Sequence, residues 1–289
     1  MNNKIAKVLG LIPDSLYLRM RYFMYTHKIL NLHNPKRFNE KLQWLKLYNR
    51  KPEYTVMVDK FLAREYIKNT IGKQYLIPLI GAWDSVDEID FDTLPNKFVI
   101  KCNHNSGDGM YICTDKSKMD VEKVKAGLKR GLEQDYYACD REWPYKNVPR
   151  KIVAEEYLDD GSGKGLNDYK VFNFDGEPFV IQVDFDRFTD HKKNLYTTDW
   201  KLCDFSFNYP SHPEIEIPKP ETLEEMLRLS RILSKGTPYM RTDFYSVNGK
   251  LYFGELTFFP ASGYGKFTPD EIDFMLGEKI TLPNKKIKK

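Results

Sequence analysis

Residues 241–260 read RTDFYSVNGKLYFGELTFFP, and this stretch indicates the fold more strongly than any other. Two runs rich in aromatic and β-branched residues flank Asn248-Gly249, the dipeptide most typical of a tight β-hairpin. The runs also hold two carboxylates, Asp243 and Glu255. Burying them is costly unless they pair or bind a cation, and Mg²⁺ prefers such oxygen ligands. The hairpin is therefore a candidate metal site, and the alternative is two carboxylates on a half-exposed sheet.

The register of this hairpin decides whether its carboxylates meet. With a strict two-residue turn, Asp243 lies opposite the residue before Glu255, and Glu255 points to the other face of the sheet. With a three-residue loop, in which Gly249 is left-handed and closes a G1 bulge, Asp243 lies opposite Glu255 and Arg241 lies opposite Thr257. We predict this bulged register.

Outward from the hairpin, periodicity predicts strands and helices in separate runs. Strands are expected at 97–104, 110–115, 151–158, 168–174 and 178–188, with those from residue 151 onward in one sheet. Helices are expected from the N-cap Asn39, around 59–68, after Asp120, after a capping box at Thr222, and after Thr268-Pro269. This segregation favours an α+β fold over a doubly wound parallel sheet.

Changes of pattern near residues 92 and 150 give three expected regions. They are a mainly helical N-terminal region (1–92), a small lobe (93–150) and a large lobe that contains the hairpin (151–289).

Composition excludes several classes of protein. With 289 residues, 41% hydrophobic and a net charge of +4, the chain is neither disordered nor a nucleic-acid-coating protein. Its four cysteines contain no C-x-x-C pair, so we expect neither a zinc knuckle nor a disulfide framework. Reduced cysteines are typical of a cytoplasmic location, which we expect for this chain. No apolar run approaches the ~18–20 residues of a membrane span. We expect a soluble, unprocessed chain.

The first 30 residues mix basic and apolar side chains. The basic ones are Lys4, Lys7, Arg19, Arg21 and Lys28. We expect a helix packed on its own domain, and the alternative is a helix lying on an anionic membrane surface.

Lys101 and the loop after it form a candidate phosphate site. The lysine lies in an apolar strand, and the loop offers backbone N–H groups that few side chains obstruct, from Asn105, Ser106, Gly107 and Gly109. The alternative is a glycine-rich hairpin with a snorkelling lysine. Neither the P-loop motif nor the Rossmann fingerprint occurs.

The strand at 152–158 is a weaker candidate for binding a purine. It ends in two acids, Glu155 and Glu156, and a strand that becomes a linker can offer backbone groups to a purine edge while a carboxylate accepts from its amine. The alternative is ordinary acids at a strand end.

Taken in order, these features resemble the ATP-grasp superfamily. Six segments are similar to its TupA-like group, which is associated with teichuronopeptide and other cell-surface polysaccharide synthesis. The segments are NEKLQWLKLYNR (39–50), DKFLAREY (59–66), KCNHNSGDGMYI (101–112), NDYKVFNFDGEP (167–178), the hairpin (241–260) and SGYGKFTPDEID (262–273). The resemblance implies an ATP-grasp fold, in which two α+β lobes close on ATP, with the N-terminal region helping to bind the acceptor.

The resemblance also implies roles in binding ATP. Lys101, and less closely Lys60, match lysines that hold the α- and β-phosphates, and residues 105–109 match a phosphate lid. The adenine and ribose contacts fall to the Glu155 carboxylate, the backbone of Glu156 and Leu158, and Asp168.

Further roles implied by the resemblance concern the metal and the reacting groups. Asp243 and Glu255 match Mg²⁺ ligands, Arg241 matches the arginine that steadies the charged intermediate, and residues 260–263 match a substrate-binding turn. The third metal position, usually asparagine, is Thr257, so a second metal is expected to be held loosely or through water. Lys170 and Arg187 have no secure match, and we hypothesise that they contact the γ-phosphate or the carboxylate acceptor.

The activity implied is an ATP- and Mg²⁺-dependent carboxylate–amine ligase, which forms an amide through an acylphosphate. The expected partners are a small-molecule or lipid-linked glycan acceptor, such as a uronic acid, and an amine, with peripheral contact at the inner face of the membrane. The alternatives are a sugar kinase, a glycosyltransferase and a carbohydrate-binding module.

Overall fold

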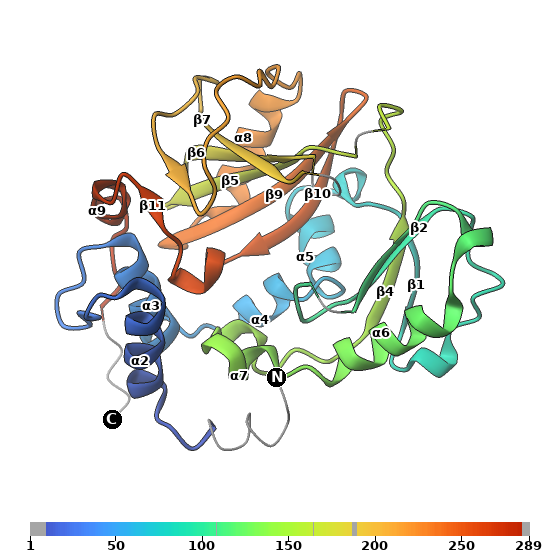
Figure 1. Cartoon of the computed structure of the whole chain (residues 1–289), viewed down its shortest axis with the longest axis horizontal. Helices are drawn as coiled ribbons and strands as arrows, with labels where there is room; N and C mark the ends of the chain where they lie inside the picture. Colours follow the sequence, from blue (N-terminus) through green and yellow to red (C-terminus); the bar gives the residue numbers. More distant parts are fainter. Residues whose placement is uncertain (1–9, 108, 164, 187–189, 285–289) are drawn as a thin grey trace. The chain divides into compact units, whose positions relative to one another are not determined.

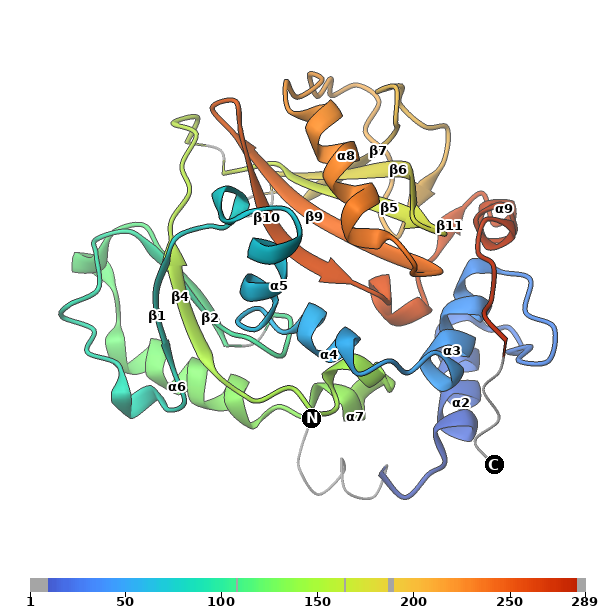
Figure 2. The ribbon, with the colours of Figure 1, turned by 180° about the vertical axis from the view of Figure 1, so that it is seen from behind.

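The computed structural model describes residues 10–107, 109–163, 165–186 and 190–284. Contacts divide the chain into two compact units (Figures 1 and 2). Unit 1 comprises residues 1–11 and 51–158, and unit 2 comprises residues 12–50 and 159–289. The three regions expected from the sequence remain a prediction. Contacts group residues 12–50 with the C-terminal part of the chain, whereas the prediction assigned them to a separate N-terminal region.

Unit 1 contains a four-stranded antiparallel sheet. Its order is β1 (Leu79–Trp83), β4 (Ile152–Glu156), β2 (Phe98–Cys102) and β3 (Met110–Cys113). The expectation that the strand at 151–158 joins the later strands was wrong. Ile152 and Ala154 are apolar on the same face as Ile100, and all three are buried in one core.

Helix α6 (Val121–Glu133) covers one face of this sheet. It begins after Asp120, as predicted, and the Asp120 side chain accepts a hydrogen bond from the backbone N–H of Lys123. Val124 and Leu128 pack against that face, where Ile100 is buried. Because side chains alternate along a strand, Lys101 lies on the other face. The remaining helices of unit 1 are α4 (Glu53–Val58), α5 (Ala63–Thr70), α7 (Tyr136–Asp140) and the short turns η1 (Lys73–Tyr75), η2 (Val86–Glu88), η3 (Lys116–Lys118) and η4 (Trp143–Tyr145).

Unit 2 is built on a five-stranded antiparallel sheet. Its order is β10 (Lys250–Thr257), β9 (Tyr239–Val247), β5 (Asp168–Phe174), β6 (Glu177–Phe185) and β7 (Lys192–Thr197). Helix α8 (Leu223–Ser234) packs against β5, β6 and β9, and Figure 2 shows it across the sheet. The predicted capping box at Thr222 does not form, because the Thr222 hydroxyl donates to the Ser246 hydroxyl instead.

Helix α3 (Phe38–Tyr48) packs against α9 (Glu271–Glu278) in unit 2. Its N-cap is Arg37 and not Asn39, because Asn39 lies inside the helix and donates its side-chain amide to the carbonyl of Gly265. The predicted apolar stripe is confirmed: Phe38, Leu42 and Leu45 are buried.

The N-terminal helix α2 (Asp14–Thr26) also packs on unit 2. It buries Tyr17, Leu18 and Tyr22, and the ring of Tyr22 contacts Tyr264, so the expected packing of this helix on its own domain is confirmed. The remaining elements of unit 2 are β8 (Ser206–Phe207), η5 (Pro260–Gly263) and β11 (Phe267–Thr268). Among the described residues, every helix is too short or too polar to cross a membrane.

Candidate active site

The face of the unit 2 sheet opposite α8 gathers charged side chains from neighbouring strands. Thr242 bonds to Ser230 of α8, so its neighbours Arg241 and Asp243 point to the other face. Residues paired directly across antiparallel strands share a face. Asp243 pairs with Lys170 on one side, which places both side chains together.

The bulged register predicted for the hairpin is confirmed, but the bulge lies elsewhere. Asp243 pairs with Glu255, and Arg241 pairs with Thr257. The turn itself is the strict two-residue type, with Val247 paired to Lys250, and the register shifts between Phe253 and Glu255. The extra residue is Gly254, where an added Cβ would lie 3.1 Å from the Asp243 carbonyl oxygen. The glycine thus lets the strand bend against its neighbour and brings the two carboxylates onto one face.

Arg241 joins the polar groups of this hairpin. It donates to both carboxylate oxygens of Asp243, at 2.7 and 2.6 Å, and its Nη2 also lies 3.1 Å from Glu255 Oε1 and 3.1 Å from Thr257 Oγ1. Burial lowers the pKa of Arg241, but the charge and hydrogen bonds of Asp243 outweigh this effect and raise it. Arg241 is therefore a fixed cation.

Lys170 is a second buried cation on the same face. It pairs with Asp168, and its Nζ lies 3.3 Å from Asp184 and 3.9 Å from Asp243. Burial lowers the pKa of Lys170, but the charges of Asp168, Asp243 and Asp184 raise it overall. The lysine is held in its charged form among three carboxylates.

The donor set fits a divalent cation. Among the described residues, no group of three or more histidine, cysteine or acidic side chains is placed to hold a metal. Mg²⁺, however, is commonly bound by one or two carboxylates together with substrate phosphates and water. Asp243 and Glu255 supply such a pair, and burial raises the pKa of Asp243 although Arg241 and Lys170 lie beside it, so a further cation would favour the charged form of this carboxylate. The Thr257 hydroxyl lies 3.3 Å from Glu255 Oε1 and adds a neutral oxygen.

In unit 1, Lys101 lies beside a glutamate and an arginine. Its Nζ is 2.6 Å from Glu155 Oε2, and Arg64 Nη1 is 2.7 Å from Glu155 Oε1. Arg64 comes from α5 and also donates to the carbonyl of Ile77. Two cations thus share one carboxylate, which leaves positive charge for an anion. Glu155, expected to meet an adenine amine, is engaged by both cations in this structure.

Lys60 and Asn105 position the loop that follows β2. Lys60 Nζ donates to the Asn105 carbonyl at 2.8 Å. The Asn105 side-chain amide donates to the carbonyl of Gly131 and to Gln134 Oε1, so it anchors the loop to the end of α6. Asn105 is therefore placed as a support for the loop, and its predicted contact with phosphate stays a prediction.

The two glycines expected to approach phosphate differ in their surroundings. Gly107 has a φ of +92° and nothing near its missing Cβ, and Ser106 before it is exposed. Gly109 has a φ of +73°, and an added Cβ would lie 2.7 Å from Cys102 Sγ and 2.9 Å from Gly131 Cα. Packing therefore requires glycine at 109, while Gly107 leaves its backbone open to a ligand.

The remaining predicted nucleotide contacts are divided between the units. Glu156 donates its backbone N–H to the Pro78 carbonyl, so this group is already used inside unit 1. Leu158 is the last residue of unit 1, whereas Asp168 opens β5 in unit 2 and pairs with Lys170. The cleft expected between Lys101 and the Asp243 carboxylate stays a prediction, since each residue belongs to a different unit.

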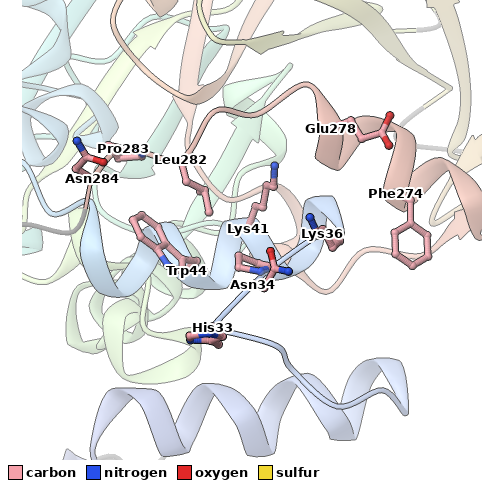
Figure 3. A pocket seen from close by; sticks show the side chains of 11 residues that line it. His33, Asn34, Lys36, Lys41, Trp44, Phe274, Glu278, Leu282, Pro283 and Asn284 are labelled. Carbon is pink, nitrogen blue, oxygen red and sulfur yellow. The ribbon is translucent and has the colours of Figure 1, made fainter.

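Unit 2 also contains an open cavity of about 750 Å³ beside α3 (Figure 3). In the view, Lys36 and Lys41 extend toward the same side, and Trp44 and Phe274 lie at opposite ends. The Lys41 pKa is lowered by burial and by the charge of Lys36. The cavity is therefore cationic with aromatic walls, and Glu278 is the acid among its lining residues.

Comparison with known families decides the relationship. The model of the TupA-like ATPgrasp family matches residues 40–281, which is most of the chain. The chain belongs to this TupA-like ATP-grasp family. Its α+β architecture is accordingly that of the ATP-grasp fold. A search among curated proteins found no match.

Solved structures similar to this TupA-like protein are ATP-grasp ligases. D-alanine–D-alanine ligase from Bacillus anthracis, complexed with ATP, is 19% identical with a TM-score of 0.41, over 70% of this chain and 53% of that one. The ATP-grasp ligase PsnB, complexed with a precursor variant, Mg and ADP, is 11% identical with a TM-score of 0.43, over 83% and 64%. The Helicobacter pylori D-alanine–D-alanine ligase is 16% identical with a TM-score of 0.40, over 85% and 70%. The chain thus spans about half the length of the first of these proteins.

The sequence did not predict two charged contacts in this TupA-like protein, that of Arg64 with Glu155 and that of Asp184 with Lys170. Arg64 lies four residues after Lys60 in the helix expected around residues 59–68, and that spacing was the available signal. Asp184 pairs with Asp168 across β5 and β6 and contacts Lys170, which no local pattern reveals. Arg187 lies outside the described residues, so its predicted role is not placed.

Proposed function

We propose that this TupA-like protein is an ATP-dependent carboxylate–amine ligase of cell-surface polysaccharide synthesis. One observation carries the proposal: in a chain of this family, Asp243 and Glu255 lie opposite each other on the charged face and are bridged by Arg241. An acidic pair suited to a divalent cation, beside fixed guanidinium and ammonium groups, suits phosphoryl transfer between two anionic groups.

The proposed reaction activates a carboxylate. A carboxylate oxygen bonds to the γ-phosphorus of ATP while the bond from that phosphorus to the bridging oxygen of ADP breaks, which gives an acylphosphate. An amine then bonds to the carbonyl carbon and loses a proton, and inorganic phosphate leaves with the electrons of the broken carbon–oxygen bond. Bound Mg²⁺ neutralises phosphate charge.

Side chains of both units would assist this reaction. Asp243 and Glu255 hold the metal, Thr257 adds a neutral oxygen, and Arg241 and Lys170 offset the negative charge that gathers as two anions meet. In unit 1, Lys101 would hold phosphate oxygens. This is favoured because Glu155 pairs with Arg64 as well as with Lys101 and so does not neutralise both cations.

The cavity beside α3 supports an anionic sugar as the acceptor. Lys36 and Lys41 supply positive charge, and exposed aromatic side chains such as Phe274 commonly contact sugar rings. Lys41 donates to the Ile280 carbonyl and so has a structural role, whereas Lys36 is exposed. Lys36→Glu should therefore raise the KM for a uronate-bearing acceptor about tenfold with an unchanged KM for ATP. Lys219→Glu, at an exposed lysine that precedes α8 and pairs with Glu224, is the matched control.

The reaction itself is tested by product analysis. The protein is incubated with ATP, Mg²⁺, a uronic acid and a mixture of amino acids, and ADP, phosphate and amide are measured. A ligase gives all three in equal amounts, and hydroxylamine in place of the amine gives a hydroxamate. ADP with a phosphorylated sugar would identify a kinase instead. Release of nucleoside diphosphate from a nucleotide sugar without ATP would identify a glycosyltransferase, and either result contradicts the proposal.

A further inference from the structure

Helix α2 exposes an apolar stripe on the side away from its packed face. Leu16, Met20, Phe23 and Met24 recur at helical spacing and are 49–63% exposed, and we call them the outer face of α2. Of the 16 large hydrophobic side chains exposed in the described part of the chain, six lie within residues 16–29. Such a concentration marks an interaction surface, since scattered exposed hydrophobic residues are normal but clustered ones are not.

The helix that carries this stripe is fixed in place. Its inner side buries Tyr17, Leu18 and Tyr22. Arg19 Nη1 donates to the Leu30 carbonyl at 2.8 Å, which ties the helix to the segment that follows it. Asp14 pairs with Arg50 at 2.6 Å. The outer face therefore belongs to an anchored helix and is presented in a defined orientation.

The charge around the outer face is positive. The first 30 residues hold five basic side chains and one acidic one, a net charge of +4 that equals the net charge of the whole chain. Arg19 follows Leu16 by three residues and Arg21 precedes Met24 by three residues, so the two arginines border the stripe on its two sides. Asp14, the acid of this segment, is neutralised by Arg50, and Lys28 pairs with Asp270.

We propose that the outer face of α2 docks on the surface of an anionic phospholipid bilayer. An anchored helix that presents Leu, Met and Phe between arginines matches the pattern of helices that lie in the membrane interface. The apolar side chains enter the headgroup boundary, and the arginines contact lipid phosphates, each contributing ~1 kcal/mol of attraction. A second copy of the chain is disfavoured as the occupant, because a symmetric contact brings two segments of charge +4 together.

The outer face of α2 is connected by a short segment to the cavity beside α3. Residues 27–37 lead from the end of α2 directly to the cavity beside α3, where His33 and Lys36 are lining residues. Figure 3 shows this segment running between the helix and the cavity. A protein held to the bilayer by α2 presents the cavity close to the lipid surface, which suits an acceptor carried on a lipid. This last use rests on the proposed function, whereas the docking itself does not.

Vesicle flotation tests the proposal with the full chain and no ATP or substrate. We expect the protein to float with phosphatidylcholine vesicles that contain 30% phosphatidylglycerol, and far less with phosphatidylcholine alone. Phe23→Ser with Met24→Ser should weaken the partition coefficient at least about tenfold. Arg21→Gln, which keeps the anchoring contact of Arg19, should weaken binding to the anionic vesicles about fivefold and leave binding to phosphatidylcholine unchanged.

Matched variants separate docking from general effects. Leu202→Ser with Ile232→Ser removes two exposed hydrophobic residues elsewhere in unit 2 and should leave flotation within twofold of the wild type. If the Phe23/Met24 variant melts early, Leu16→Ser with Met20→Ser takes its place. No flotation with anionic vesicles overturns the proposal. A second outcome also overturns it: light scattering shows that the wild type is a dimer and the Phe23/Met24 variant is a monomer, and neither protein binds vesicles. Because ATP is absent, failure of the ligase reaction leaves this result unaffected.

Discussion

The charged faces of the two sheets differ in the sign of their excess charge: it is positive in unit 1 and negative in unit 2. In unit 1, Lys101 and Arg64 share the single carboxylate of Glu155. In unit 2, four carboxylates surround three cations: Lys170 and Arg241 lie among Asp168, Asp184, Asp243 and Glu255, and Lys193 Nζ lies 4.0 Å from Asp184. An excess of positive charge suits phosphate oxygens, and an excess of negative charge suits a metal ion. Unit 1 is thus suited to an anion, and unit 2 is suited to a cation.

Both charged faces arise from the same rule. Each sheet gives one face to a helix, α6 in unit 1 and α8 in unit 2, and alternation then directs every second side chain to the opposite face. A helix needs only an apolar face to pack against. The other face is thus left for charged residues, and their signs set what it binds.

The largest effect is expected from the acidic pair of unit 2. Glu255→Gln keeps the shape of the side chain but removes the charge for a metal, so turnover should fall about 10³-fold. Glu177→Gln, in the same sheet but paired with exposed Arg231, is the control and should leave turnover unchanged. Steady-state ADP release measures both. If Glu255→Gln turns over ATP as fast as Glu177→Gln, Glu255 does not bind the metal.

A smaller loss is expected from the cationic site of unit 1. Lys101→Ala removes one of the two cations that share Glu155, so kcat/KM for ATP should fall about 10²-fold. Lys151→Ala, whose partner is the exposed Asp84, is the control in the same unit. Calorimetry with ATP and Mg²⁺ reports the binding directly. If both variants bind ATP as tightly as the wild type, the phosphate site does not lie on this face.

The units are also expected to differ in their response to pH. Burial lowers the pKa of His104 in unit 1 to about 4, below its value in the unfolded chain. The unfolded state therefore binds more protons between about pH 6.5 and 4, and stability falls as the pH drops through this window, by up to roughly 3 kcal/mol. His104→Gln should lose much less stability than the wild type between pH 7 and 4.5 in urea unfolding. In unit 2, the raised pKa of Asp243 works in the opposite sense, because its stabilising contribution is lost as the pH rises.

An equal loss of stability in wild type and His104→Gln would assign the acid sensitivity to other groups. Arg150→Gln is a suitable control for the charge near His104, since Arg150 is exposed and contributes a smaller effect to the same pKa.

The smallest effect is expected from the third metal position. Thr257→Asn keeps a neutral oxygen next to Arg241 and should change turnover by less than about threefold. Thr257→Val removes one hydrogen bond of Arg241, which keeps its acceptors on Asp243 and Glu255, and should lower turnover about tenfold, in line with the loss of one hydrogen bond to a charged group. Titration of activity with Mg²⁺ distinguishes the two variants. A loss as large in the asparagine variant as in the valine variant would contradict a role for the oxygen.

Local signals predicted much of the fold. Asn248-Gly249 placed the hairpin, Asp120 placed the start of α6, and the spacing of Phe38, Leu42 and Leu45 placed α3, because turn chemistry, capping and periodicity act within a few residues. The register was predicted correctly for an incorrect reason. Gly254, and not the turn, provides the extra residue, since a bulge within a strand depends on how closely the neighbouring backbone approaches.

The sequence by itself determined the α+β class, the hairpin with its paired carboxylates, and membership of the TupA-like ATP-grasp family. Only the tertiary structure decided that β4 pairs with β2, that Arg64 reaches Glu155, that Lys170 lies among three carboxylates, and that α2 leaves an apolar face exposed. The physical reason is range. Turns and periodicities are set by neighbours along the chain, whereas pairing between distant strands and the burial of a helix face depend on which surfaces fit together after folding.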